Sequence, residues 1–227
     1  MSAILFGSMG TVVDTSELQR EAFNQAFADH GLDWSWDRDT YVAKLEQSGG
    51  RQRIEEHARS TGETVDAEAV HATKSQRFQE AMSRGGLEPR PGVAETIRAA
   101  KDGGLKVALV TTTSADNLEA MFAGLQDKVL ASDFDLVVDT TQVETPKPDA
   151  AAYSYALQEL EERPDDCVAV EDNVGGVSAA VAAGVPCLAL PNQNTAGHDF
   201  GRADDVVESV DLDRLRELMR AQPPVQP

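Results

Sequence analysis

Four short stretches of the sequence carry residues that could bind a phosphate or a divalent cation. The first, residues 7–11, is discussed below, after the other three. Thr111 and Thr112 begin a hydroxyl cluster, Lys147 lies between two prolines, and Glu171 and Asp172 form an acidic pair. A hydroxyl at the start of a helix and a rigidly presented lysine suit a phosphate, whereas paired carboxylates suit Mg²⁺. Each stretch alone could be a helix cap or a surface charge, so their joint placement carries the hypothesis.

These stretches follow predicted strands of a single sheet. The apolar runs that predict the strands are residues 3–6, 106–111, 136–138, 168–170 and 187–190. Helical patterns alternate with them at residues 93–102, 115–125, 150–161, 174–183 and 212–219. Buried strands that alternate with helices indicate a parallel sheet covered on both faces, which binds ligands at the carboxyl ends of its strands.

A helical block interrupts this alternation after the first strand. Thr15 is typical of a helix N-cap, and apolar residues then recur at helical spacing as far as Gly31. Further helical patterns cover residues 38–47, 51–61 and 67–84. We therefore expect an α/β core from residues 1–14 and 89–221, an inserted all-helical cap from residues 15–88, and a flexible tail at residues 222–227.

The composition excludes several classes of partner. The chain has 20 basic and 39 acidic residues, a net charge of −19, and no basic patch, which argues against nucleic acid. No apolar run is long enough to span a membrane and no signal peptide is evident, so we expect a cytoplasmic protein. Cys167 and Cys187 begin apolar runs and are predicted to be reduced core residues.

In this order, the motifs resemble those of the haloacid dehalogenase (HAD) superfamily of phosphatases and phosphomutases. The helical block resembles the helical cap of that family. The likeness is closest to the CbbY-like sugar-bisphosphate phosphatases of the xylulose-1,5-bisphosphate type. Segments that carry it include ELQREAFNQAF, LVTTTSADN, KPDAAAYSYAL and VEDNVGGVSAAVAAGV. The resemblance implies a Rossmann-like core, a phosphorylated small-molecule ligand and Mg²⁺.

The first motif departs from the pattern that this resemblance implies. Such enzymes begin with Asp-x-Asp-Gly-Thr, in which the first aspartate is the nucleophile and the second is the general acid/base. Gly10 and Thr11 match the end of the motif, so Gly7 and Met9 stand at the two reactive positions. Neither can attack phosphorus or exchange a proton, so no catalytic residue is expected. Ser8 is predicted to point to the opposite face from position 7 and is a poor replacement.

The resemblance also assigns the remaining site residues. It implies phosphate binding by Gly10, Thr111, Thr112 and Lys147, and substrate contacts by Asp14, Gly50, Arg51 and Arg53. Residues 48–53 resemble a substrate-specificity loop, in which Arg51 stands where relatives often carry lysine. Without carboxylates at positions 7 and 9, only the acidic pair Glu171 and Asp172 is left for Mg²⁺, which is expected to bind weakly.

Three functions are compatible with the sequence. The first is a non-catalytic HAD-fold protein that binds a phosphorylated small molecule. The second is an active hydrolase that uses metal-held water or a non-standard residue, and the third is an interaction module with a vestigial pocket. Retention of Thr111, Lys147 and Asp172 favours the first over the third, and the absence of a base beside the phosphate position favours it over the second. The sequence identifies no protein partner.

Overall fold

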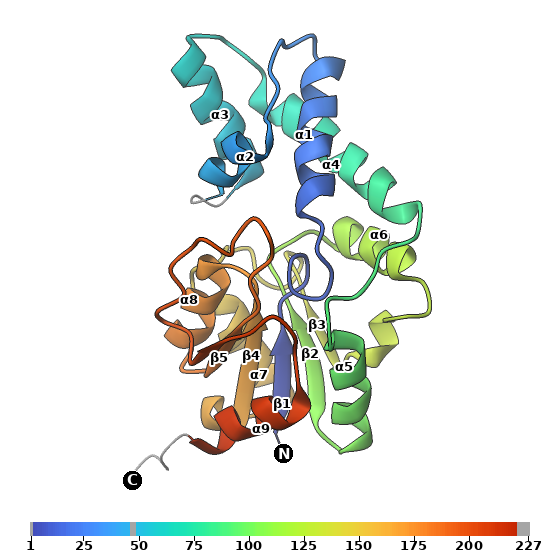
Figure 1. The fold of residues 1–227 in the computed structure, drawn as a ribbon, viewed down its shortest axis with the longest axis vertical. Coiled ribbons are helices and arrows are strands. Elements are labelled where there is room, and N and C mark those ends of the chain that lie inside the picture. The colour runs from blue at the N-terminus through green and yellow to red at the C-terminus, as the bar shows by residue number, and fades with distance from the viewer. Residues whose placement is uncertain (1, 46–48, 222–227) are drawn as a thin grey trace.

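A parallel sheet forms the centre of the protein. The computed structural model describes residues 2–45 and 49–221, and within them the sheet has six strands in the order β3-β2-β1-β4-β5-β6 (Figure 1). The strands are β1 (Ala3–Phe6), β2 (Lys106–Val110), β3 (Leu136–Val138), β4 (Cys167–Glu171), β5 (Cys187–Ala189) and β6 (Asp205–Val206). The predicted parallel α/β fold is confirmed. β6 is missed because its two residues form no apolar run.

Helices cover both faces of this sheet. One face packs against α5 (Val93–Asp102), α6 (Ala115–Leu125) and α9 (Leu212–Ala221), and the other against α7 (Ala151–Leu160) and α8 (Val174–Ala182). Ile4 and Phe6 of β1 belong to the first apolar cluster, whereas Ala3 and Leu5 belong to the second. Successive side chains of a strand point to opposite faces, so a strand buried on both faces is apolar throughout.

The helical block lies beyond the carboxyl ends of the strands (Figure 1). It consists of α1 (Ser16–Asp29), α2 (Arg38–Lys44), α3 (Gly50–Thr61) and α4 (Ala67–Ser83), and its described residues contain no strand. Phe23, Phe27 and Trp36 form an aromatic centre for this block, with Trp36 4.9 Å and 4.7 Å from the two phenylalanine ring centroids. The far end of α4 differs, because Phe78 and Met82 pack with the core and α4 contacts α6.

Several predicted boundaries shift by one or more residues. The helix predicted at 38–47 ends at Lys44, and residues 46–48 lie outside the described residues, as does the predicted tail at 222–227. Two short 3₁₀ helices, η1 (Ala131–Asp133) and η2 (Pro164–Asp166), have no sequence signal strong enough to predict them. Among the described residues, none of the helices has the length and apolar character needed to cross a bilayer. Cys167 and Cys187 are buried free thiols, as predicted.

Candidate functional site

A cavity of about 1080 Å³ opens between the strand ends and the helical block. Its floor includes Ser8, Met9, Gly10, Thr111, Thr112, Lys147, Glu171 and Asp172. Its roof includes Gln19 of α1, Tyr41 of α2, and Gly49, Gln52 and Arg53 at the start of α3. The floor therefore brings together side chains from all four stretches singled out from the sequence.

Lys147 and Glu171 form a buried ion pair in this floor. The Lys147 ammonium donates to Glu171 Oε1 and to the Val110 carbonyl, the latter at 2.8 Å. The Tyr153 hydroxyl donates to the same Glu171 oxygen at 2.6 Å. Burial, and then the charge of Glu171, raise the pKa of Tyr153 well above its usual value, so this phenol stays a hydrogen-bond donor. Glu171 is thereby fixed in a single orientation.

The Glu171 carboxylate occupies the space beside Gly7. A Cβ atom at position 7 would lie 2.7 Å from Glu171 Oε2 and 2.6 Å from Thr11 Oγ1. A Cβ atom at position 176, in the first turn of α8, would lie 2.2 Å from the same Glu171 oxygen. Both distances are far shorter than van der Waals contact, so this arrangement requires glycine at both positions. Position 7 is therefore packed by its neighbours.

Asp172 is buried and hydrogen-bonded within the protein. Its Oδ1 accepts from Thr11 Oγ1 and Asn173 Nδ2, and its Oδ2 accepts from Asn192 Nδ2, each at 3.1 Å. Burial, and then the charge of Glu171, raise the pKa of Asp172 to about 7, although the bonds from Asn173 and Thr11 lower it. Asp172 therefore exchanges its proton near neutral pH.

The side chains of the floor do not fit Mg²⁺, the cation that the resemblance implies beside Glu171 and Asp172. Three of the four oxygens of these carboxylates already accept hydrogen bonds from the protein, and the fourth is wedged against Gly7 and Gly176. Met9 lines the cavity but has no hard oxygen in its side chain, whereas Mg²⁺ prefers hard oxygen ligands. Within the described residues, no group of three or more His, Cys, Asp or Glu residues could hold a metal ion.

Two hydroxyl groups meet on the floor. Ser8 Oγ donates to Thr111 Oγ1 at 2.8 Å, and the Thr113 amide donates to the same Thr111 oxygen at 3.2 Å. Thr111 accepts both bonds, so its own proton is left for an acceptor in the cavity. The sequence predicts that Ser8 points away from position 7. Ser8 nevertheless lines the cavity. The strand β1 ends at Phe6, so the rule that successive side chains point to opposite faces no longer applies at Ser8.

A buried lysine lies behind the roof. The Lys74 ammonium is 3.4 Å from Gln19 Oε1 and lies over the rings of Phe23 and Phe78, 5.0 Å and 4.7 Å from their centroids. Burial, and then the charge of Arg53, lower the pKa of Lys74 to about 7, whereas the two rings favour the charged form. Sequence reasoning missed this residue. The signal that could have identified Lys74 is its position in the apolar stripe of α4, four residues before Phe78, which predicts a buried side chain.

The two arginines predicted to contact a substrate lie in different places. Arg53 lines the cavity and donates from Nε to the Lys44 carbonyl at 2.8 Å. Arg51 is exposed and pairs with Glu68 at 2.9 Å and with Glu55 at 3.3 Å. Arg51 is not among the described residues that line the cavity.

The other predicted cap residues contribute less to the cavity. Gly50 lies against His71, where a Cβ atom would be 2.7 Å from Nε2, and Asp14 accepts from the Ser16 amide at 3.0 Å. Neither Gly50 nor Asp14 is among the described lining residues. Ser48, the first residue of the predicted specificity loop, lies outside the described residues.

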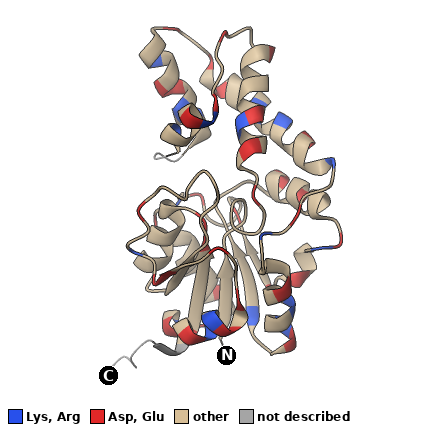
Figure 2. Cartoon of the chain, in the orientation of Figure 1, with Lys and Arg blue, Asp and Glu red and all other residues tan. Residues whose placement is uncertain are grey.

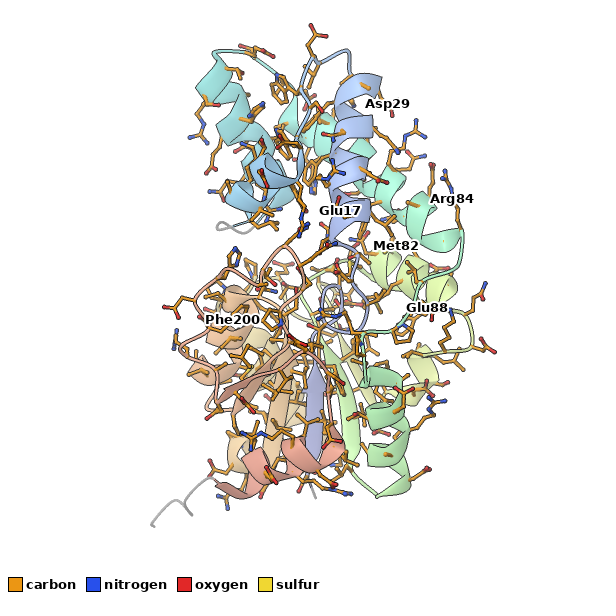
Figure 3. All side chains as sticks on the ribbon, in the orientation of Figure 1. Glu17, Asp29, Met82, Arg84, Glu88 and Phe200 are labelled. Carbon is orange, nitrogen blue, oxygen red and sulfur yellow. The ribbon has the colours of Figure 1, made fainter. Side chains whose placement is uncertain are left out.

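Contacts between the helical block and the loop after β5 close one side of the cavity. Arg38, at the start of α2, donates to Asn194 Oδ1 at 3.0 Å and to the Gln193 carbonyl at 2.8 Å. The Asn194 amide in turn lies 3.5 Å from Glu17 Oε1. Glu17 lies at the end of α1 that is nearest the sheet (Figure 3). The roof is therefore held over the floor.

Comparison with known proteins agrees with this architecture. The family model described as haloacid dehalogenase-like hydrolase matches residues 1–184. Protein CbbY of Cereibacter sphaeroides is 36% identical over 212 residues, which covers 92% of each chain. Protein CbbY of Rhodobacter capsulatus is 37% identical and covers 90% of this chain and 91% of its own.

Two solved structures are similar over most of the chain. A crystal structure of a CbbY mutant from Rhodobacter sphaeroides in complex with xylulose-(1,5)bisphosphate has a TM-score of 0.82 and 36% identity. It covers 92% of this chain and 94% of its own. A second structure of CbbY from that organism, in complex with phosphate, has the same TM-score and coverage.

Replacing Gly176 with alanine should destabilise the protein, because the new methyl group would collide with the Glu171 carboxylate. We expect a loss of about 1–3 kcal/mol in the free energy of unfolding, although alanine favours a helix over glycine. Gly197→Ala is the matched control, since a Cβ atom there meets nothing within 4 Å. Denaturant unfolding measures both variants. Equal stabilities would contradict the packing described for Glu171.

Asp172→Asn should change how stability depends on pH. The pKa of Asp172 is raised from 3.8 to about 7, so between these values the native state keeps a proton that the unfolded chain has lost. Wild-type stability must therefore fall as pH rises through this window, and asparagine removes that contribution. As the pH rises from about 5 to about 8, the free energy of unfolding of the variant should therefore increase by about 2 kcal/mol relative to that of wild type. Urea unfolding at a series of pH values measures this difference, and a flat difference would refute the assignment.

Proposed function

The chain belongs to the haloacid dehalogenase-like hydrolase family, and from this premise we propose that it binds a phosphorylated small molecule without aspartyl-phosphate catalysis. In this proposal residues 15–88 act as a cap over a core formed by residues 1–14 and 89–221. The ligand lies in the cavity between them. A sugar phosphate is the favoured class, because similar CbbY structures hold xylulose-(1,5)bisphosphate and phosphate.

The observation that carries the loss of catalysis is the packing around Gly7. No side chain at position 7 can attack phosphorus, and Glu171 and Thr11 fill the space that such a side chain would need. Glu171 does not replace it, because Oε1 is bonded to Lys147 and Tyr153 while the whole residue is 2% exposed. Phosphoryl transfer through an enzyme carboxylate requires a nucleophile presented to the ligand.

Ligand binding is supported by donors on both walls of the cavity. Thr111 has a proton free to donate on the floor, and Lys147 lines the floor beside it. On the roof, Arg53 lines the cavity. Charged donors of this kind bind phosphate oxygens strongly, and their placement on opposite walls suits a ligand with two anionic groups.

One observation favours a second candidate, a slow hydrolase. Asp172 has a pKa of about 7, which is suited to accepting a proton from water at neutral pH. Against this candidate, Asp172 already accepts hydrogen bonds from Thr11, Asn173 and Asn192, and the carboxylates do not fit a metal that could hold the water. We therefore place binding first and hydrolysis second.

The wild-type protein should show negligible phosphatase turnover on a panel of sugar phosphates with Mg²⁺ present. The physical reason is the missing nucleophile and proton donor, each of which is a major term in phosphoryl transfer. Phosphate release measures the rate, and the Asp172→Asn variant serves as the reference for background. Turnover well above that reference would reject the first candidate and support the hydrolase.

Arg53→Ala should weaken binding of xylulose 1,5-bisphosphate by about tenfold or more, because it removes a charged donor from the roof. Arg51→Ala is the matched control. It lies two residues away on the same helix and carries the same charge, but it pairs with surface acids. Calorimetric titration gives both affinities. Equal losses in the two variants would show that only the net charge of the cap matters.

A further inference from the structure

We infer that this cavity binds its oxyanion without a divalent cation, using only the fixed cations of the protein. The inference rests on the proposed function and extends it by removing the metal from the binding reaction. It comes from a disagreement between the metal that the fold family implies and the side chains that this chain places in the floor.

The carboxylates that a metal would need are already bonded within the protein. Glu171 is already neutralised by Lys147 and held by Tyr153. Asp172 is packed beneath the turn at Gly10, where a Cβ atom would lie 1.9 Å from its Oδ2. Both oxygens of Asp172 accept hydrogen bonds from protein donors, with which a cation in the cavity would have to compete. The floor therefore offers no pair of unbonded carboxylate oxygens, whereas Mg²⁺ in proteins is usually held by one or two carboxylates together with phosphates of the substrate.

An incoming phosphate meets few free negative charges on the floor. A floor rich in free carboxylates would repel a phosphate and would need a metal to bridge the like charges. Here positions 7 and 9 are Gly7 and Met9, and neither carries a charge. Besides the buried acids Glu171 and Asp172, the described lining residues include one exposed acid, Asp199, which lies in the loop that follows β5. The need for a bridging metal is therefore reduced.

Lys147 keeps one hydrogen-bond donor for a ligand. An ammonium group has three N–H donors. Two of them are used by Glu171 and by the Val110 carbonyl, which leaves one for a ligand on the floor. The ion pair with Glu171 has no net charge, but it orients Lys147 and leaves this one N–H donor for a ligand. On the opposite wall, Arg53 supplies a second fixed cation.

The direct test is a calorimetric titration of the full chain with xylulose 1,5-bisphosphate, once with EDTA and once with Mg²⁺. We expect the two dissociation constants to agree within about threefold. Binding seen only with Mg²⁺, or tightened more than about tenfold by it, would overturn the inference and leave the proposed function standing. No binding in either buffer would overturn both. A titration with MgCl₂ alone should give no saturable heat.

A charge variant tests the reason for metal independence. Met9→Asp adds a carboxylate to the floor, so affinity in EDTA should fall about tenfold and Mg²⁺ should recover part of the loss. The neutral Met9→Asn variant reports the effect of the changed shape, and only the difference between the two is interpreted. Gly7→Asp is less suitable, because it meets Glu171 and Thr11. Equal affinities of the Asp and Asn variants in EDTA would refute the charge argument.

Discussion

The buried contact between Lys147 and Glu171 is the interaction on which the floor of the cavity depends. It joins the end of β4 to the segment before α7, and Lys147 also bonds to the last carbonyl of β2. Tyr153 of α7 adds a third hydrogen bond to the same carboxylate. Removing one partner of a buried ion pair leaves an uncompensated charge and is strongly destabilising. The contact therefore constrains every residue that packs around it.

The register of the sheet explains why Gly7 is one of those residues. β1 and β4 are parallel neighbours in which Phe6 lies opposite Val170, and the Gly7 amide donates to the Val170 carbonyl at 2.9 Å. Gly7 and Glu171, the next residues along these two strands, are therefore adjacent at the strand ends. A side chain at position 7 and an inward carboxylate at position 171 compete for one volume. In this chain the carboxylate at 171 occupies it, so restoring an aspartate at position 7 would require Glu171 to turn away.

The floor could be predicted from the sequence, whereas the roof could not. Parallel strands bring their carboxyl ends to one edge of the sheet, so Thr111 and Glu171 had to meet once their strands were recognised. Side chains on helices follow a different rule. Arg51 and Arg53 lie two residues apart on α3, so their side chains leave opposite sides of the helix, about 160° apart around its axis. Of the two, only Arg53 lines the cavity. Which face of α3 would meet the sheet depends on tertiary packing, which the sequence pattern does not specify.

The acidic surface makes the enclosed cations more significant. The chain has a net charge of −19, and Figure 2 shows acidic residues both on the helices beyond the strand ends and on those around the sheet. Salt largely screens the repulsion by such a surface beyond roughly 8 Å, the screening length at physiological salt, so the repulsion opposes an anion mainly within that distance. In the proposed function, attraction then comes from short-range contacts with Lys147, Arg53 and Thr111, which line the cavity. Recognition therefore depends on how well a ligand fits between the floor and the roof, and a dissolved anion that touches only the surface gains nothing.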